Sequence, residues 1–303
     1  MADISRAEVA TLIQEAYADT LLKSAVEGST VLSAFRRVNM GTKTTHLPVL
    51  ATLPEAGWVS ESATAPEGVK PQSEVTWADR TLVAEEIAVI IPIHENVVDD
   101  ATEDTLDDIA VLGGQSVGKK LDQAVIFGTD KPASWVSPAL LPAAVAAGQA
   151  QAVVDGAANE SDIVGAINKV SESVATAGWM PDTLLASLAF RFRVANLRDA
   201  NGNPVFRDDS YSAFRTFFNK NGAWAPTSAT AIVADYSRVI IGVRQDITVK
   251  FLDQATVGTI NLAERDMVAL RIKARFAYAL GIGATPQGTN KTPVGAVTPD
   301  VTP

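Results

Sequence analysis

The chain has 303 residues, of which 47% are hydrophobic and 20% charged, with a formal net charge of −10; this composition is typical of a soluble globular protein with a sizeable core and argues against a dedicated nucleic-acid binder. The absence of cysteine excludes disulfides, thiolate metal sites and cysteine nucleophiles. No apolar run is long enough to span a bilayer, and the first ten residues do not read as a secretory signal.

The first predicted element is an amphipathic helix near the N-terminus. Ser5 and Glu8 form a capping box, and apolar residues follow at helical spacing as far as Leu21. Gly28 ends this helix, after which residues 31–47 are predicted to be extended chain.

Residues 54–81 form a long polar stretch, rich in Glu, Thr, Ser and Pro, that contains Trp58 and Trp77. A connection of more than about 12–15 residues inside a compact domain is usually either functional or disordered. Two tryptophans argue against plain disorder, because large indoles need a surface to pack on. We interpret the stretch as an extended arm that packs on a neighbouring subunit.

A strand and a long helix are predicted after the arm. Apolar residues occupy most odd positions from Val75 to Ile93, which is the period of a half-buried strand, and Pro92 suggests an edge or a strand end. Thr102 then caps a helix that runs to Phe127, a length of nearly 40 Å at about 1.5 Å per residue. The inward face of this helix is predicted to include Leu106, Ile109, Gly113, Val117, Leu121 and Ala124.

The middle of the chain is predicted to be a separate α+β unit. Residues 138–156 are rich in Ala and resemble a loosely specified connection into this unit. A helix then starts at residue 161 or 162 and stops at Gly178, and a strand at 183–187 and a helix at 190–198 follow.

Two long alternating runs, at residues 239–251 and 268–280, predict two strands. The opposite face of the second run carries Arg271, Lys273 and Arg275, which are too many like charges to be buried without partners. Beyond Pro286 the chain is rich in Thr, Pro and Gly without periodicity, so it is predicted to be a mobile tail.

No motif in the sequence indicates catalytic, cofactor-binding or metal-binding residues. His46 and His94 have no ligand-spaced partner, and neither a Gly-x-Ser-x-Gly nor a Walker motif occurs. Acidic residues between positions 99 and 108 do not have the spacing of a calcium loop, and favourable placement at the positive end of the long helix explains them more simply.

The order and spacing of these segments resemble those of tailed-bacteriophage major capsid proteins. The segments that carry the resemblance are the strand of residues 82–93, the turn of residues 96–100, a helix closing at residues 127–129, the segments 197–204 and 233–237, and a final strand through residues 275–278. Together they span most of the chain from about residue 30 to residue 285.

The resemblance implies an α+β protein with a Hong Kong 97-like capsid fold. Its expected regions are an N-terminal arm with a short helix (1–50), an extended loop (51–83), a first part of the peripheral domain with the long spine helix (84–145), an axial domain (146–238), returning peripheral and axial strands (239–285) and a flexible C-terminal tail (286–303).

The resemblance also implies that the protein has no enzymatic activity and needs no cofactor. Copies are expected to form hexamers and pentamers of an icosahedral shell, which encloses double-stranded DNA without sequence-specific binding and without a membrane. Scaffold, portal and decoration proteins are candidate partners, with assembly in the host cytoplasm and residence in the virion. Two alternatives remain open: an encapsulin-type nanocompartment shell and, more distantly, a soluble α+β enzyme.

Contacts between subunits are predicted from the arm and the second long strand. The predicted contact residues are Trp58, Glu61, Glu67, Lys70, Glu74, Trp77, Arg271, Lys273 and Arg275. The tryptophans would bury apolar surface, and the basic residues would pair with arm carboxylates of a neighbour. Some members of the family weld their subunits through an arm lysine and an asparagine. Lys70 with Asn261 and Glu264 are conceivable counterparts here, whereas an exposed Lys70 is the simpler interpretation.

Overall fold

The computed structural model describes residues 28–59, 72–96, 103–153, 163–197, 214–252, 254–285, 287 and 291–299. The predicted helix within residues 5–21 and residues 198–204 of the segment 197–204 lie outside these ranges. Of the helices in the described part of the chain, none is both long and apolar enough to cross a membrane.

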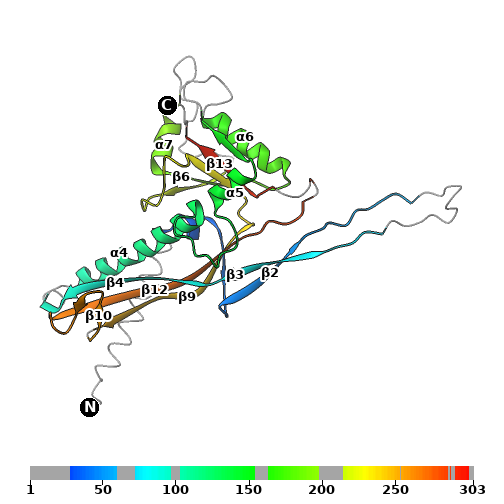
Figure 1. Cartoon of the computed structure of the whole chain (residues 1–303). Helices are drawn as coiled ribbons and strands as arrows, with labels where there is room; N and C mark the ends of the chain where they lie inside the picture. The colour runs from blue at the N-terminus through cyan, green and yellow to red at the C-terminus, as the bar shows by residue number, and fades with distance from the viewer. Residues whose placement is uncertain are drawn as a thin grey trace, which may run out of the picture.

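Two folded units and a projecting two-stranded ribbon make up the molecule (Figure 1). The first unit and the ribbon contain α2 (Thr30–Ala34), β1 (Arg36–Asn39), β2 (Thr44–Leu50), β3 (Trp77–Val83), β4 (Glu85–His94), α4 (Glu103–Asp122), the π-helical turn η1 (Gln123–Phe127), β9 (Val239–Leu252), β10 (Thr256–Val257), β11 (Ile260–Asn261) and β12 (Met267–Leu280). The second unit contains α5 (Leu140–Ala146), β5 (Ala150–Ala152), α6 (Ile163–Thr176), β6 (Thr183–Ser187), α7 (Leu188–Ala195), β7 (Arg215–Asn219), β8 (Ala231–Ala234) and β13 (Val294–Thr298).

The first unit is built on a sheet with the strand order β1-β9-β12-β4. The strand β12 pairs antiparallel with β4 on one side and with β9 on the other, so that Ile272 lies opposite both Val89 and Val249. Alternate side chains of β12 therefore line a continuous apolar face, as the period of two in the sequence predicts. Both long strands lie within a residue or two of their predicted positions.

The long helix α4 packs on this apolar face, as Figure 1 shows. A Cβ atom at Gly113 would overlap Cδ1 of Ile272, so glycine allows the helix to approach the sheet. The helix continues through η1 and stops at Gly128, whose φ of 77° is a left-handed conformation that glycine adopts readily. The predicted helix end at Phe127 is thus confirmed.

The second unit is a sheet with the order β5-β13-β8-β6-β7, covered by helices. The strand β6 and the helices α6 and α7 correspond to the predicted strand and helices of this unit, and Gly178 ends α6 with a φ of 87°. Ile167 and Val170 are among the α6 side chains that are buried in the core of this unit.

Three local predictions are wrong. Residues 294–298, expected within a mobile tail, form β13, which lies between β5 and β8 with Val294, Ala296 and Val297 fully buried. The Ala-rich connection contains α5 and β5, and α2 begins where extended chain was expected. In each case the element is short, and contacts with distant residues rather than local periodicity stabilise it.

Candidate assembly surfaces

The projecting ribbon is an arm formed by β2 and β3. These strands pair antiparallel from Thr44 opposite Val83 to Leu50 opposite Trp77, and the ribbon extends away from both folded units (Figure 1). Pairing continues beyond the strands, because the amide of Ala51 donates to the carbonyl of Thr76 at 2.8 Å. The arm is therefore an ordered element without a core of its own.

Four large apolar side chains of the arm are exposed. Trp58 is 102% exposed, Trp77 66%, Val59 50% and Val75 43%. Exposed indole side chains are costly in water, and aromatic residues are enriched where proteins meet. These four side chains, which we call the arm patch, lie along the ribbon and have the composition of a surface that packs on another molecule.

The root of the arm is fixed by a loop from the first unit. The break between β3 and β4 is at Ala84. The loop bonds to the residues on either side of this break. Trp135 Nε1 donates to the carbonyl of Val83 at 2.9 Å, and the Ser134 hydroxyl donates to the carboxylate of Glu85 at 2.7 Å. Lys131 holds the loop itself, since its Nζ donates to two backbone carbonyls of the loop at 2.6 and 2.8 Å. Partial burial lowers the pKa of Lys131.

A second set of contacts holds the other side of the arm root. The amide of Ala284 donates to the carbonyl of Leu50 at 2.8 Å, and the guanidinium of Arg80 donates to the carbonyl of Ile282 at 3.4 Å. The chain that follows β12 therefore ties both strands of the arm to the body.

Asp122, at the end of α4, joins the two folded units. Its carboxylate is fully buried and accepts hydrogen bonds from Ser29 Oγ at 2.6 Å and from the amides of Thr30 and Val31 at 2.9 and 3.1 Å. The side chains of Asn219 and Asn221, from the second unit, donate to it at 3.2 and 2.8 Å. Burial raises the pKa of Asp122, and the hydrogen bonds act in the opposite direction.

Basic side chains follow one side of β12, away from α4. Lys273 Nζ and Arg275 Nε lie 3.6 and 3.5 Å from the same Glu86 carboxylate oxygen. Arg271 lies opposite Lys250 in the register and has no ion-pair partner among the described residues. This basic strip is half-buried, with fewer acidic than basic groups beside it.

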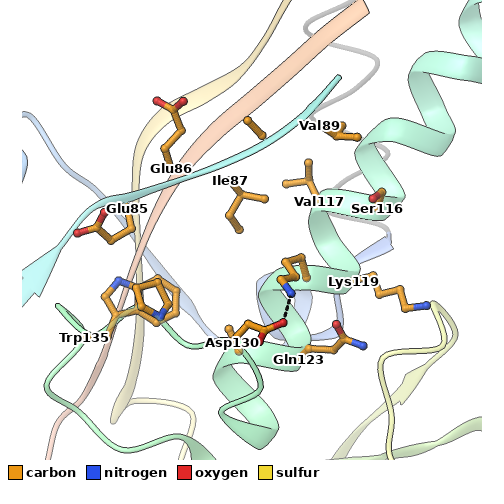
Figure 2. Close-up of a pocket in the computed structure, with 14 residues that line it drawn as sticks. Glu85, Glu86, Ile87, Val89, Ser116, Val117, Lys119, Gln123, Asp130 and Trp135 are labelled. Carbon is orange, nitrogen blue, oxygen red and sulfur yellow. Dashed lines mark hydrogen bonds and ion pairs between the residues drawn. The ribbon is translucent and has the colours of Figure 1, made fainter. Parts of the chain in front are cut away.

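A groove separates β4 from α4 near the arm root (Figure 2). It encloses about 500 Å³, with Ile87, Val89 and Val117 as part of its apolar lining and Trp135 at one end. Charged side chains stand at its rim, where Lys120 pairs with Asp130 at 2.5 Å.

The predicted contact residues are distributed over the arm and the basic strip. Trp58, Glu74 and Trp77 are exposed on the arm, whereas Glu61, Glu67 and Lys70 lie outside the described residues. The ribbon leaves one end of the long sheet and the hairpin β10–β11 lies at the other (Figure 1).

Asp122 and Trp135 were not among the residues predicted from the sequence. The available signals were an acidic residue beside the apolar run of residues 124–126 and a lone Trp before two prolines.

The two histidines occupy separate structural positions. His46 contacts the carboxylate of Asp79 across the ribbon, and His94 ends β4. Within the described part of the chain no three His, Asp or Glu side chains gather closely enough to hold a metal ion.

The structure combines an ordered arm with exposed indoles, a long sheet backed by a long helix, and a second sheet covered by helices. This combination defines a class of protein, the structural subunits that build shells. The chain matches the model of the family described as "Phage capsid family" over residues 10–281, and it belongs to this family. No curated protein matches the chain.

Solved structures support the same assignment. The chain is 76% identical to a protein of Mycobacterium phage Bobi, with 99% of each chain covered and a TM-score of 0.84. It is 72% identical to one of Mycobacterium phage Adephagia, with 100% of each covered and a TM-score of 0.85. A protein of Microbacterium phage Oxtober96 is 39% identical, with 90% and 91% covered and a TM-score of 0.80.

These comparisons confirm the resemblance drawn from the sequence and its α+β capsid fold. The protein is a major capsid protein, a structural component of the virion rather than an enzyme, and its copies build the capsid shell. The encapsulin and enzyme alternatives are thereby set aside.

Proposed function

We propose that copies of this protein assemble as hexamers and pentamers into an icosahedral shell in which each arm packs on a neighbouring subunit. The observation that carries the proposal is the arm patch, because Trp58 is fully exposed on the isolated chain. Burying this apolar surface would give each contact its affinity, and closure of the shell would multiply contacts that are individually weak.

The proposed contacts pair the arm with the basic strip of a neighbour. Trp58 and Trp77 supply apolar surface, and the acidic arm residues Glu61, Glu67 and Glu74 approach Arg271, Lys273 and Arg275, with Lys70 among the contacts of the arm. Glu86 already balances part of the charge of Lys273 and Arg275 within one chain. Arg271 is therefore the residue of the strip with the most to gain from a carboxylate on another subunit.

The proposed regions follow the capsid fold. Residues 84–145 and 239–285 form the peripheral domain, residues 146–238 with β13 form the axial domain around the symmetry axes, and residues 51–83 form the extended loop. The shell would enclose double-stranded DNA without sequence-specific binding, in keeping with the net charge of −10. Scaffold, portal and decoration proteins would join it in the host cytoplasm.

Expression of the protein alone tests this proposal by negative-stain electron microscopy and size-exclusion chromatography. Closed particles, tubes or ring-shaped capsomers are the expected result. The same preparation should be repeated with the scaffold of the source phage co-expressed. A strictly monomeric protein at high concentration in both preparations would contradict the proposal.

A further inference from the structure

The turn after β7 carries a pair of residues that is chemically labile. Asn221 and Gly222 form one of the two Asn-Gly pairs in the chain. Asparagine is among the thermolabile residues, and a following glycine, which has no Cβ, lets its own amide nitrogen approach the asparagine side chain. Gly222 is exposed with a φ of 71°, and its amide donates to no acceptor within the described ranges. The attacking group of a deamidation is therefore accessible.

Three hydrogen bonds hold the side chain of Asn221. Its Nδ2 donates to the carbonyl of Gly28 at 2.5 Å and to Oδ2 of Asp122 at 2.8 Å. Its Oδ1 accepts from the amide of Ala223 at 2.9 Å. Deamidation removes Nδ2 as ammonia, so both bonds of this nitrogen must break during the reaction. The contacts of the folded chain therefore oppose the deamidation that the Asn-Gly pair favours.

The surroundings of Asn221 suit an amide and not a carboxylate. We call Asp122, residues 28–31, Asn219 and Asn221 the junction, because these groups join the two folded units. Asp122 and the carbonyl of Gly28 are acceptors that each receive a proton from Asn221. Oδ1 of Asn219 is already a buried acceptor without a donor. A carboxylate at position 221 would place a negative charge against Asp122, with no spare donor among these described residues to stabilise it.

A cation lies beside the turn, outside the junction. Nζ of Lys119 would be 3.8 Å from a Cβ atom added at Gly222. Lys119 is exposed, and no acidic side chain in the part of the chain that the structure describes pairs with it. A carboxylate expelled from the junction thus has a partner in Lys119.

We propose that Asn221 is a deamidation site that the closed junction protects, and that its conversion opens the junction permanently. The nitrogen of Gly222 attacks Cγ of Asn221, so that an N–Cγ bond forms while the Cγ–Nδ2 bond breaks. Nδ2 leaves as ammonia with the proton that the Gly222 nitrogen gives up. Water then opens the succinimide ring at one of its two carbonyls, which leaves aspartate or isoaspartate at position 221.

The conversion would detach the chain before α2 from the second unit. The bond from Asn221 to the carbonyl of Gly28 holds the point at which residues 1–27 join the body. This bond and the bond to Asp122 are lost when the new carboxylate turns toward Lys119. An opening of the junction is reversible until ammonia leaves, so the reaction converts a transient opening into a lasting one.

The rate of conversion in the full-length chain tests the protection. Folded chain and chain unfolded in urea are kept in the same mildly alkaline buffer, and tryptic peptides are analysed by mass spectrometry for the mass gain and for isoaspartate. Conversion of Asn221 should be slower in the folded chain by about tenfold or more, because two hydrogen bonds of Nδ2 must be lost. Equal rates in the two samples would overturn the inference.

A variant that weakens the junction without touching the reacting groups sharpens this test. Ser29→Ala removes a donor to Asp122, so it should speed the conversion in the folded chain by about tenfold. Ser171→Ala is the matched control, because the hydroxyl of Ser171 donates to a carbonyl within α6, away from the junction. Equal acceleration by both changes would show that general unfolding admits the reaction, and it would contradict the proposed role of the junction.

The product of the reaction is tested directly by Asn221→Asp. Hydrogen exchange should increase by about tenfold in α2 and stay unchanged in β12, and addition of Lys119→Gln should lower the unfolding temperature further. Asn39→Asp, the same change at an exposed position of β1, is the control. Exchange in α2 equal to that of the wild type would sink the inference. If the Asn221 variant does not fold, the comparison of conversion rates decides the question by itself.

Discussion

At the scale of single residues, Asp122 is the buried polar group that joins the two folded units. Five donors surround its buried carboxylate, three from the N-cap and first residues of α2 and two from the second unit. Asp122→Asn puts an amide donor among them, so it should destabilise the fold by about 1–3 kcal/mol. Chemical denaturation of the wild-type and variant chains at low concentration measures the difference.

The pH dependence of that difference has a defined sign. Burial raises the pKa of Asp122 above its ordinary value of 3.8, so the native state binds more protons than the unfolded state between 3.8 and the native pKa. The contribution of Asp122 to stability is therefore full below pH 3.8 and declines as the pH rises through the native pKa. The destabilisation by Asp122→Asn should shrink over this window; a difference that grows with pH would contradict the raised pKa.

Gly113 is a residue whose role in the fold is decided by a single contact, that with Ile272. Alanine in a helix normally gains up to about 1 kcal/mol over glycine. Here the added Cβ overlaps the fully buried Ile272, so Gly113→Ala should instead cost about 1–3 kcal/mol. Thermal unfolding checks the sign, with Gly41→Ala as a control because nothing lies within 4 Å of a Cβ there.

At the scale of elements, the direction of the arm depends on one loop. Trp135→Phe removes the donor to the carbonyl of Val83 and keeps most of the ring that packs 6.0 Å from Tyr278. We expect hydrogen exchange to increase by about tenfold in β3, corresponding to one lost hydrogen bond, and to stay unchanged in β6. Equal changes in both strands would indicate general destabilisation instead.

The strand β13 is the element whose loss should be most damaging. Truncation after Gln287 removes a strand from between β5 and β8, and with it buried Val294 and Val297. The remaining sheet is split, so the second unit should lose its cooperative unfolding transition. Truncation after Pro299 retains β13 and should have little effect on the transition measured by calorimetry.

At the scale of the whole molecule, assembly should respond to charge on the basic strip while the fold does not. Arg271→Glu should raise the concentration needed for assembly by about tenfold, since an attraction across the subunit contact becomes a repulsion. Lys220→Glu, at an exposed position outside the strip, is the matched control. Light scattering of assembly and the unfolding temperature of the subunit separate the two effects; unchanged assembly of the Arg271 variant would count against the proposed contact.

Long periodic elements were predictable from sequence because each residue's environment repeats along the element. The helix that ends before Gly128 and the strands β9 and β12 were found in this way. The exposed tryptophans of the arm were also recognised, because a polar stretch with two indoles cannot form a core of its own.

Elements that depend on distant partners were not predictable. The Thr292 hydroxyl donates a hydrogen bond to the side-chain oxygen of Gln149 at 2.9 Å, although the two residues are 143 positions apart in the sequence. This bond helps to hold β13 beside β5. Asp122 likewise has partners about 90 residues away on both sides in the sequence. The groove combines β4, α4 and the loop at Trp135, and no one of these segments indicates it alone.

The sequence by itself thus determined the family, the long helix, the paired long strands and the presence of an arm, since hydrophobic period, turn residues and the order of segments are local properties of the chain. Only the tertiary structure decided the place of the last strand, the hydrogen bonds of the buried Asp122, the contacts that fix the root of the arm, and the groove between β4 and α4. Each of these arises where separate segments meet, and the free energy that fixes them comes from burial and hydrogen bonds between residues far apart in the chain.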